Sequence, residues 1–250
     1  MFSSIDHGGR YAFGNQPDIA LWNLARFAEA LLPLLGEEAE QAAAEATRVL
    51  EGFAPRYRRH LLEGQRAKLG VRAGPGASDE GDAALATDWL ALLHRDRVDF
   101  TLAWRHLADA AAGDQAPLHG LFADAAALEA WLVRWRERCA REDEGAADGN
   151  AADGSAANAG AMNGGATKGR AAPAAARRAE RMRGVNPWVI PRNHRVEEAL
   201  AAASDQGDLG PFERLLAALR RPYEESADNL RYAEPAPAEL TACYQTFCGT

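Results

Sequence analysis

The chain has 250 residues, enough for one large domain or two small ones, and a formal net charge of -8. That acidity argues against a nucleic-acid binder, because phosphate binding needs clustered Lys and Arg, and no apolar run approaches the about 20 residues that span a bilayer. Three cysteines are too few for a secreted disulfide framework, and the start does not resemble a signal peptide. We therefore expect a cytoplasmic protein without nucleic-acid or membrane partners.

Frequent Ala and scarce Val and Ile predict a mainly all-α fold. A first helix is expected over residues 18–35, with Pro17 and Asp18 suiting its first turn. A second helical stretch covers residues 38–65, and Pro55 is expected to kink or split it. Further amphipathic helices are expected over residues 82–94, 99–111 and 124–142.

The six tryptophans lie mainly on these predicted helices. They could line a ligand pocket, but large indoles in helical proteins more often fill the gaps between helices. We favour the packing interpretation.

The helical pattern stops at Asp143. Residues 143–176 are mostly Ala, Gly, Asn and Asp, so they cannot bury enough apolar surface to offset the entropy of ordering. We predict a disordered low-complexity insert between a first domain at 1–142 and a helical extension with a tail at 177–250.

The part after the insert begins with four arginines, interpreted as a solvated helix start: Arg177, Arg178, Arg181 and Arg183. This helix should end before Asn186-Pro187, because the residue before proline avoids helical geometry. Residues 188–190 are expected to form a buried extended plug. Two more helices are expected at 194–204 and 209–219, and the chain after Pro222 should be an irregular tail.

Motifs for catalysis are missing from the sequence. There is no phosphate-binding loop, and the glycines of the 70–76 region are interpreted as turn residues. Cys243 and Cys248 are not spaced as a metal-binding pair, and the scattered histidines resemble surface or capping residues. We therefore predict no catalytic, cofactor-binding or metal-binding residue.

Three long segments carry a family resemblance. Residues 4–17 read S-I-D-H-G-G-R-Y-A-F-G-N-Q-P and lead into W-N-L-A-R at 22–26. Residues 186–194 read N-P-W-V-I-P-R-N-H, and residues 207–219 are followed by R-P-Y at 221–223. Together these segments resemble the carboxy-terminal half of the selenoprotein O (SelO, YdiU) family of protein adenylyltransferases.

The resemblance implies the helical C-lobe of a protein kinase-like fold. It also implies transfer of AMP from ATP to Ser, Thr or Tyr hydroxyls of protein substrates, with Mg²⁺ or Mn²⁺. In that family the ATP-binding, catalytic and metal-binding motifs precede the D-H-x-G-R-Y stretch. The resemblance thus implies that an N-terminal lobe is missing here, and that this chain alone is inactive and binds neither ATP nor metal tightly.

Residue roles follow from the same resemblance. Asp6, His7, Arg10 and Tyr11 are expected to support the activation-like segment through charge-assisted hydrogen bonds, with protein-substrate docking as the alternative. Asn23 and Arg26 could fix that segment from the following helix.

Two further roles concern the end of the chain. Asn186, Arg192 and Asn193 resemble a capping cluster for a buried turn. Cys248 matches the near-terminal position of the family that is associated with redox control, although Met1–Tyr11 contains no cysteine to pair with it. Cys243 is an alternative partner, and two reduced thiols are the simpler interpretation.

Two functions therefore stay open at this level. One is an enzyme segment that works only with the upstream lobe, and the other is a helical interaction module without catalysis. A severed lobe should expose an apolar patch where the missing part packs.

Overall fold

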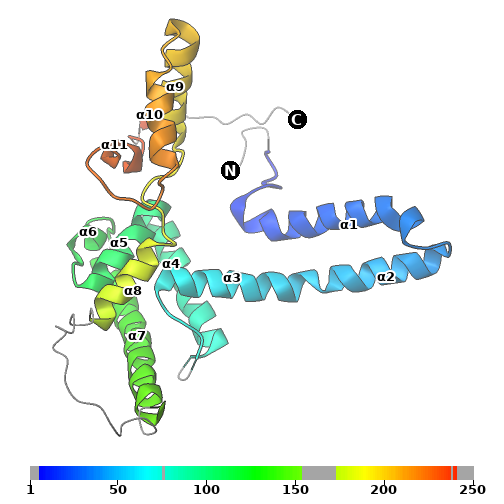
Figure 1. Cartoon of the computed structure of the whole chain (residues 1–250), viewed down its shortest axis with the longest axis horizontal. Helices are drawn as coiled ribbons and strands as arrows, with labels where there is room; N and C mark the ends of the chain where they lie inside the picture. Colours follow the sequence, from blue (N-terminus) through cyan, green and yellow to red (C-terminus); the bar gives the residue numbers. More distant parts are fainter. Residues whose placement is uncertain (1–5, 75–76, 154–172, 238, 241–250) are drawn as a thin grey trace, which may run out of the picture. The chain divides into compact units, whose positions relative to one another are not determined.

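The computed structural model describes residues 6–74, 77–153, 173–237 and 239–240, and every regular element in these ranges is a helix (Figure 1). The expected mainly all-α fold class is confirmed. The chain divides into two units, one of Leu62–Ala236 and one of Met1–Leu61 with Pro237–Thr250. Each is described by itself.

The first unit is built on two neighbouring helices, α1 (Gln16–Leu35) and α2 (Ala39–Glu51), with a short 3-10 helix η1 (Phe13–Asn15) before them. Pro17 and Asp18 lie in the first turn of α1, as predicted.

The second predicted helical stretch divides into α2 and α3 (Phe53–Leu69), which runs on from α2 (Figure 1). The predicted split is present, but the division lies at Gly52, three residues before Pro55. Pro55 lies in the first turn of α3, where a proline costs no helical hydrogen bond because the first amides of a helix have no intrahelical partner.

The apolar face of α1 is exposed. The predicted spacing of apolar residues has formed a helix, yet no residue of α1 is buried. Leu24, Phe27 and Leu35 are 41%, 61% and 50% exposed, respectively. This is an apolar patch of the kind expected for part of a larger lobe.

The second unit has a tryptophan-rich core between α4 (Asp79–Asp96), α5 (Phe100–Ala112), α6 (Ala116–His119), α7 (Ala125–Asp153) and α8 (Ala174–Arg183). The ring centroids of Trp89 and Trp131 are 4.5 Å apart, and those of Trp89 and Trp104 are 5.7 Å apart. Trp135 donates its indole N–H to the carbonyl of Leu69 at 2.9 Å. For these four buried side chains the interhelical packing interpretation is confirmed.

A buried carboxylate joins three helices of this unit. Asp82 of α4 is 1% exposed and accepts hydrogen bonds at 2.7 Å from both Arg66 of α3 and Arg138 of α7. Burial alone would raise the pKa of Asp82, but the hydrogen bonds and charges of the two guanidinium groups outweigh it and lower that pKa. The ionised carboxylate therefore holds α3, α4 and α7 together.

Helix α7 continues past the predicted end at Glu142 to Asp153, and α8 begins at Ala174. Helix is therefore present at both ends of the predicted insert at 143–176, which is consistent with the high helix propensity of its alanines. Residues 154–172, the middle of the predicted insert, lie outside the described residues.

A second apolar cluster includes residues of α9 (Asn193–Gln206) and α10 (Gly210–Leu219), two helices that Figure 1 shows side by side. Trp188 and Val189 are buried there, as predicted for the extended plug. The tail after Pro222 contains α11 (Leu230–Ala233), and Tyr232 and Ala233 are buried. The prediction of an irregular tail was wrong in this part, because these two side chains complete the cluster.

A helix that crosses a lipid bilayer must be long and predominantly apolar. Among the described residues, no helix combines the length and the apolar character needed to span one.

Candidate functional site

The D-H-G-G-R-Y strip forms a self-contained turn. The Asp6 carboxylate accepts hydrogen bonds from the backbone amides of Arg10 at 2.8 Å and Tyr11 at 2.9 Å. Gly9 has a φ of 66°, a conformation that glycine adopts without steric cost. Asn15 then donates its side-chain amide to the Gly9 carbonyl at 2.8 Å. The strip is thus shaped by Asp6 and its backbone, while His7 is exposed.

The two arginines of this region meet at one exposed indole. The guanidinium carbon of Arg10 lies 4.6 Å from the ring centroid of Trp22, and that of Arg26 lies 5.6 Å from it. Arg26 also pairs with Glu29 at 2.5 Å. These cation–π contacts link the strip to α1. Asp6 thus binds backbone amides of its own strip and the Arg10 side chain contacts a ring, while the supporting role of these residues stays a prediction.

Two of the three family-like segments meet in the second unit. The backbone amides of Trp188 and Val189 both donate to the carbonyl of Pro222, at 2.7 and 3.0 Å. Residues 186–194 and 221–223 therefore form one structural junction, which sequence separation alone does not reveal.

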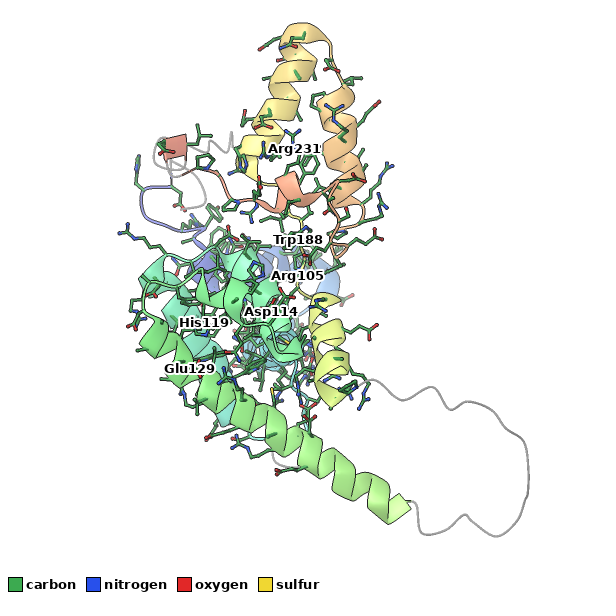
Figure 2. The ribbon with its side chains drawn as sticks, turned by 90° about the vertical axis from the view of Figure 1, so that its left-hand side faces the viewer. Arg105, Asp114, His119, Glu129, Trp188 and Arg231 are labelled. Atoms are coloured by element: carbon green, nitrogen blue, oxygen red, sulfur yellow. The ribbon has the colours of Figure 1, made fainter. Side chains whose placement is uncertain are left out.

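Arg105 is the central polar residue of this junction and was missed by the sequence reasoning. Its guanidinium donates to the carbonyls of Arg183 and Asn186, both at 3.2 Å, and pairs with Glu225 at 3.3 Å. It also lies 5.8 Å from the ring centroid of Trp188 (Figure 2). A charged residue directly after Trp104 in the middle of α5 was the available signal.

The predicted capping cluster of Asn186, Arg192 and Asn193 was wrong. Asn186 is buried and donates to the Lys68 carbonyl at 3.1 Å, whereas Arg192 forms a fork on the Asp99 carboxylate at 2.7 and 3.1 Å. Asn193 is exposed. The side chains of Asn186 and Arg192 therefore bind different partners, and the three residues do not form one cluster.

Asp99 itself begins α5 by accepting a hydrogen bond from the Leu102 amide at 2.9 Å. Burial would raise the pKa of Asp99, but the hydrogen bonds from Arg192 and Leu102 outweigh it and lower that pKa. This ion pair connects the α5 start to the α9 start.

The interpretation of the four arginines of α8 as a solvated helix start was wrong for Arg178, Arg181 and Arg183, whereas Arg177 is exposed. Arg178 is 5% exposed and donates to the carbonyls of Gly70 and Cys139, both at 3.1 Å, and to the Asp143 carboxylate. Arg183 pairs with Asp109 at 2.6 Å. The run is basic because α8 docks through guanidinium groups onto carbonyls and carboxylates of neighbouring elements.

The histidines differ in their surroundings, and the Nε2 atom of His194 is buried without a hydrogen-bond partner among the described residues. His119 lies 3.7 Å from Glu129 on a half-exposed surface (Figure 2), and His106 lies 2.9 Å from Asp109. Among the described residues, no group of three His, Cys, Asp or Glu side chains could hold a metal ion.

The predicted redox residue Cys248, and its alternative partner Cys243, lie outside the described residues. Cys139 is buried, and burial raises the pKa of its thiol to about 11. Such a thiol is protonated and unreactive at neutral pH.

The fold and these sites define an all-α protein whose ordered polar positions are built mainly from arginines on carboxylates, carbonyls and aromatic rings. Comparison with known proteins identifies the family. Residues 2–220 match the family described as protein adenylyltransferase SelO, and the chain belongs to that family.

Curated relatives agree with this assignment. The chain is 48% identical over 250 residues to a protein nucleotidyltransferase YdiU of Cereibacter sphaeroides, 47% identical over 251 residues to one of Chromobacterium violaceum, and 42% identical over 250 residues to one of Agrobacterium fabrum. Each match covers 100% of this chain but only 44%, 46% and 44% of the relative. The chain thus spans less than half the length of these relatives.

Proposed function

We propose that this chain is the helical carboxy-terminal part of a kinase-like protein adenylyltransferase. The complete protein would transfer AMP from ATP to Ser, Thr or Tyr hydroxyls of protein substrates. In that reaction the hydroxyl oxygen bonds to the α-phosphorus of ATP. The bond between the α-phosphorus and the oxygen that bridges to the β-phosphorus breaks, so pyrophosphate leaves, and the hydroxyl proton is released to a base or to solvent. Membership of the SelO family supports this proposal.

The observation that carries the proposal is the strip capped by Asp6. Its turn is fixed by two backbone hydrogen bonds and by contacts between Arg10 and Trp22, so it presents one conformation beside α1. A fixed strip of this kind suits an activation-like segment that supports a reaction centre or a protein substrate.

The chemistry itself is assigned to the part of the relatives that this chain does not cover. We propose a supporting role alone for the described residues, because the family resemblance assigns the ATP-binding, catalytic and metal-binding motifs to the part that precedes the D-H-G-G-R-Y strip. The chain alone is expected to be inactive.

The missing upstream part is also the partner that we propose for α1. Leu24, Phe27 and Leu35 leave an apolar face open on that helix. Covering such a face with the upstream lobe would remove it from water, at about 25 cal/mol per Å² of apolar surface buried.

Reconstitution tests this function. The chain is co-expressed with the upstream part of the Cereibacter sphaeroides relative, and protein labelling is measured with ATP carrying ³²P at the α or the γ position. We expect α-label to be transferred by the combination and by neither part alone. Transfer of γ-label, or α-labelling by the chain alone, would contradict the proposal.

Two variants test whether the strip at Asp6 contributes to the transfer. Asp6→Ala removes the acceptor that shapes the strip and should lower α-labelling several-fold. Asp18→Asn alters a nearby exposed carboxylate of α1 and should leave labelling unchanged. Equal effects of both variants on α-labelling would show that the strip has no specific role in the transfer.

The second candidate is a helical interaction module without catalysis, which the same exposed face of α1 favours. Under this alternative, Phe27→Asp would abolish association with the upstream part or another protein, while no label would be transferred by any combination. A cytoplasmic location and a redox role for Cys248 stay predictions from the sequence.

A further inference from the structure

A cleft lies between the carboxy-terminal end of α3, the loop that follows it and the end of α8. Its volume is about 530 Å³, within the range of small-molecule sites. Its apolar surface comes from residues Ala67, Val71, Ala73 and Val185. Two of its lining residues, Gly184 and Val185, lie in the chain between Arg183 and Asn186, whose carbonyls bind Arg105.

The walls of the cleft are held in place by close packing. Gly70 has a φ of 73°, and a Cβ there would meet the Met182 sulfur at 2.5 Å, so the chain after α3 lies directly against α8. The Gly70 carbonyl accepts from Arg178 at 3.1 Å and from Arg181 at 3.3 Å. A rigid wall of this kind favours a preformed site.

One guanidinium at the cleft is free to bind. The backbone of Arg72 is fixed on both sides, since its amide donates to Glu142 at 2.8 Å and its carbonyl accepts from Arg138 at 2.6 Å. Among the described residues, however, no hydrogen bond or ion pair engages the Arg72 guanidinium. The structure thus positions this residue and leaves its charge unmatched.

A second guanidinium faces the same space. Arg181 lines the cleft and is 3.5 Å from Glu142. Burial lowers the pKa of Arg181, and the neighbouring charges of Arg72 and Arg178 lower it further. The guanidinium groups of Arg72 and Arg181 therefore lie near one another at the cleft.

Among the described residues, the arginines at the cleft other than Arg72 already have carboxylate partners, and Glu142 is the partner of Arg181. Arg66 is already paired with Asp79 and Asp82, each at 2.7 Å. Glu63 is the acidic residue among those that line the cleft. The lining therefore combines an apolar floor with two guanidinium groups whose forks match planar or tetrahedral oxyanions.

We propose that this cleft binds a small organic oxyanion, a phosphate ester or a carboxylate. Its anionic group pairs with Arg72 and Arg181, and its apolar body rests on Val71 and Val185. This site is independent of the proposed transfer reaction, and its test needs no catalytic activity.

The test is calorimetric titration of the 250-residue chain with phenyl phosphate and with benzoate, which separate the two oxyanion chemistries. Inorganic phosphate serves as a third probe without an apolar body. We expect at least one aromatic anion to bind more tightly than inorganic phosphate. Failure of both to bind, or equal binding of all three, would overturn the proposal.

Variants locate the binding. Arg72→Gln should weaken it about tenfold, the loss that accompanies one charge-assisted hydrogen bond. Among the described residues the Arg72 guanidinium makes no hydrogen bond or ion pair, so the variant should fold normally. Circular dichroism checks that the variant is folded. Arg181→Gln should weaken binding similarly, and Glu63→Gln should tighten it.

Arg220→Gln is the matched control, because Arg220 is an exposed arginine at the end of α10, outside the cleft. It should leave affinity unchanged. If Arg72→Gln changed affinity no more than Arg220→Gln does, the binding would be non-specific attraction to surface arginines and the proposal would be wrong.

Discussion

Replacing Gly70 with alanine tests the packing that builds the cleft wall. An added Cβ would lie 2.5 Å from the Met182 sulfur, 2.7 Å from its Cγ and 2.8 Å from the Arg178 Cγ. The left-handed backbone conformation costs a residue with a side chain about 1–2 kcal/mol, and overpacking a well-filled site costs about 1–3 kcal/mol. Gly70→Ala should therefore destabilise the second unit by about 2–5 kcal/mol.

Gly207→Ala separates the two contributions. Gly207 has a φ of 68°, close to the 73° of Gly70, but a Cβ there would meet nothing within 4 Å. Its cost should be the backbone cost alone, about 1–2 kcal/mol. Urea unfolding followed by tryptophan fluorescence measures both variants. Equal destabilisation would refute the close approach of the α3 end to α8.

Three other predictions concern ionisable groups. Asp82→Asn leaves the guanidinium groups of Arg66 and Arg138 buried without a counter-charge and should cost about 3–5 kcal/mol in urea unfolding, whereas Asp88→Asn at an exposed pair should cost less than about 1 kcal/mol. The pKa of Asp99 is lowered in the fold, so its pairing with Arg192 contributes stability above the unfolded pKa of about 3.9 and loses it as the pH falls through the lower folded pKa. The Tm difference between the unaltered chain and Arg192→Gln should accordingly shrink between about pH 5 and pH 2, and a constant difference would exclude the ionised pair as its source. Because burial raises the pKa of Cys139 to about 11, a Cys243→Ser/Cys248→Ser chain should react with a thiol reagent at pH 8 only in denaturant, and rapid labelling of the native protein would show that Cys139 is accessible.

Helical periodicity predicted the core of the second unit well. The amphipathic helix predicted over residues 124–142 has its apolar residues at spacings of one to four on one stripe, and all five are buried: Leu128, Trp131, Leu132, Trp135 and Cys139. The stripe is reliable because a core-facing helix repeats its apolar positions every three or four residues. For α1 the same rule gave the helix but not burial, since burial depends on what packs against the face and not on the helix itself.

Charged residues in the interior were the main failure of sequence reasoning. Arg178 and Arg105 look like surface residues by type, yet both are almost fully buried. Their acceptors are carbonyls and carboxylates from distant segments, such as Gly70 and Glu225, and no local spacing encodes those contacts. The same limit hid the junction at Pro222 and the burial of Tyr232, which complete a cluster formed by long-range contacts.

The end of α7 explains why the boundary of the insert was difficult to place. Apolar periodicity fails at Asp143, but Glu142 and Asp143 are the acids that bind Arg181 and Arg178 of α8, at 3.5 and 2.9 Å. Ion pairs rather than apolar contacts therefore clamp the chain where it enters and leaves residues 144–177. Because Glu142 also accepts from the Arg72 amide, the same clamp sets the position of both arginines proposed to bind an oxyanion. A change in the insert that spares these two acids should leave the cleft intact, whereas loss of Glu142 would disturb both of its walls.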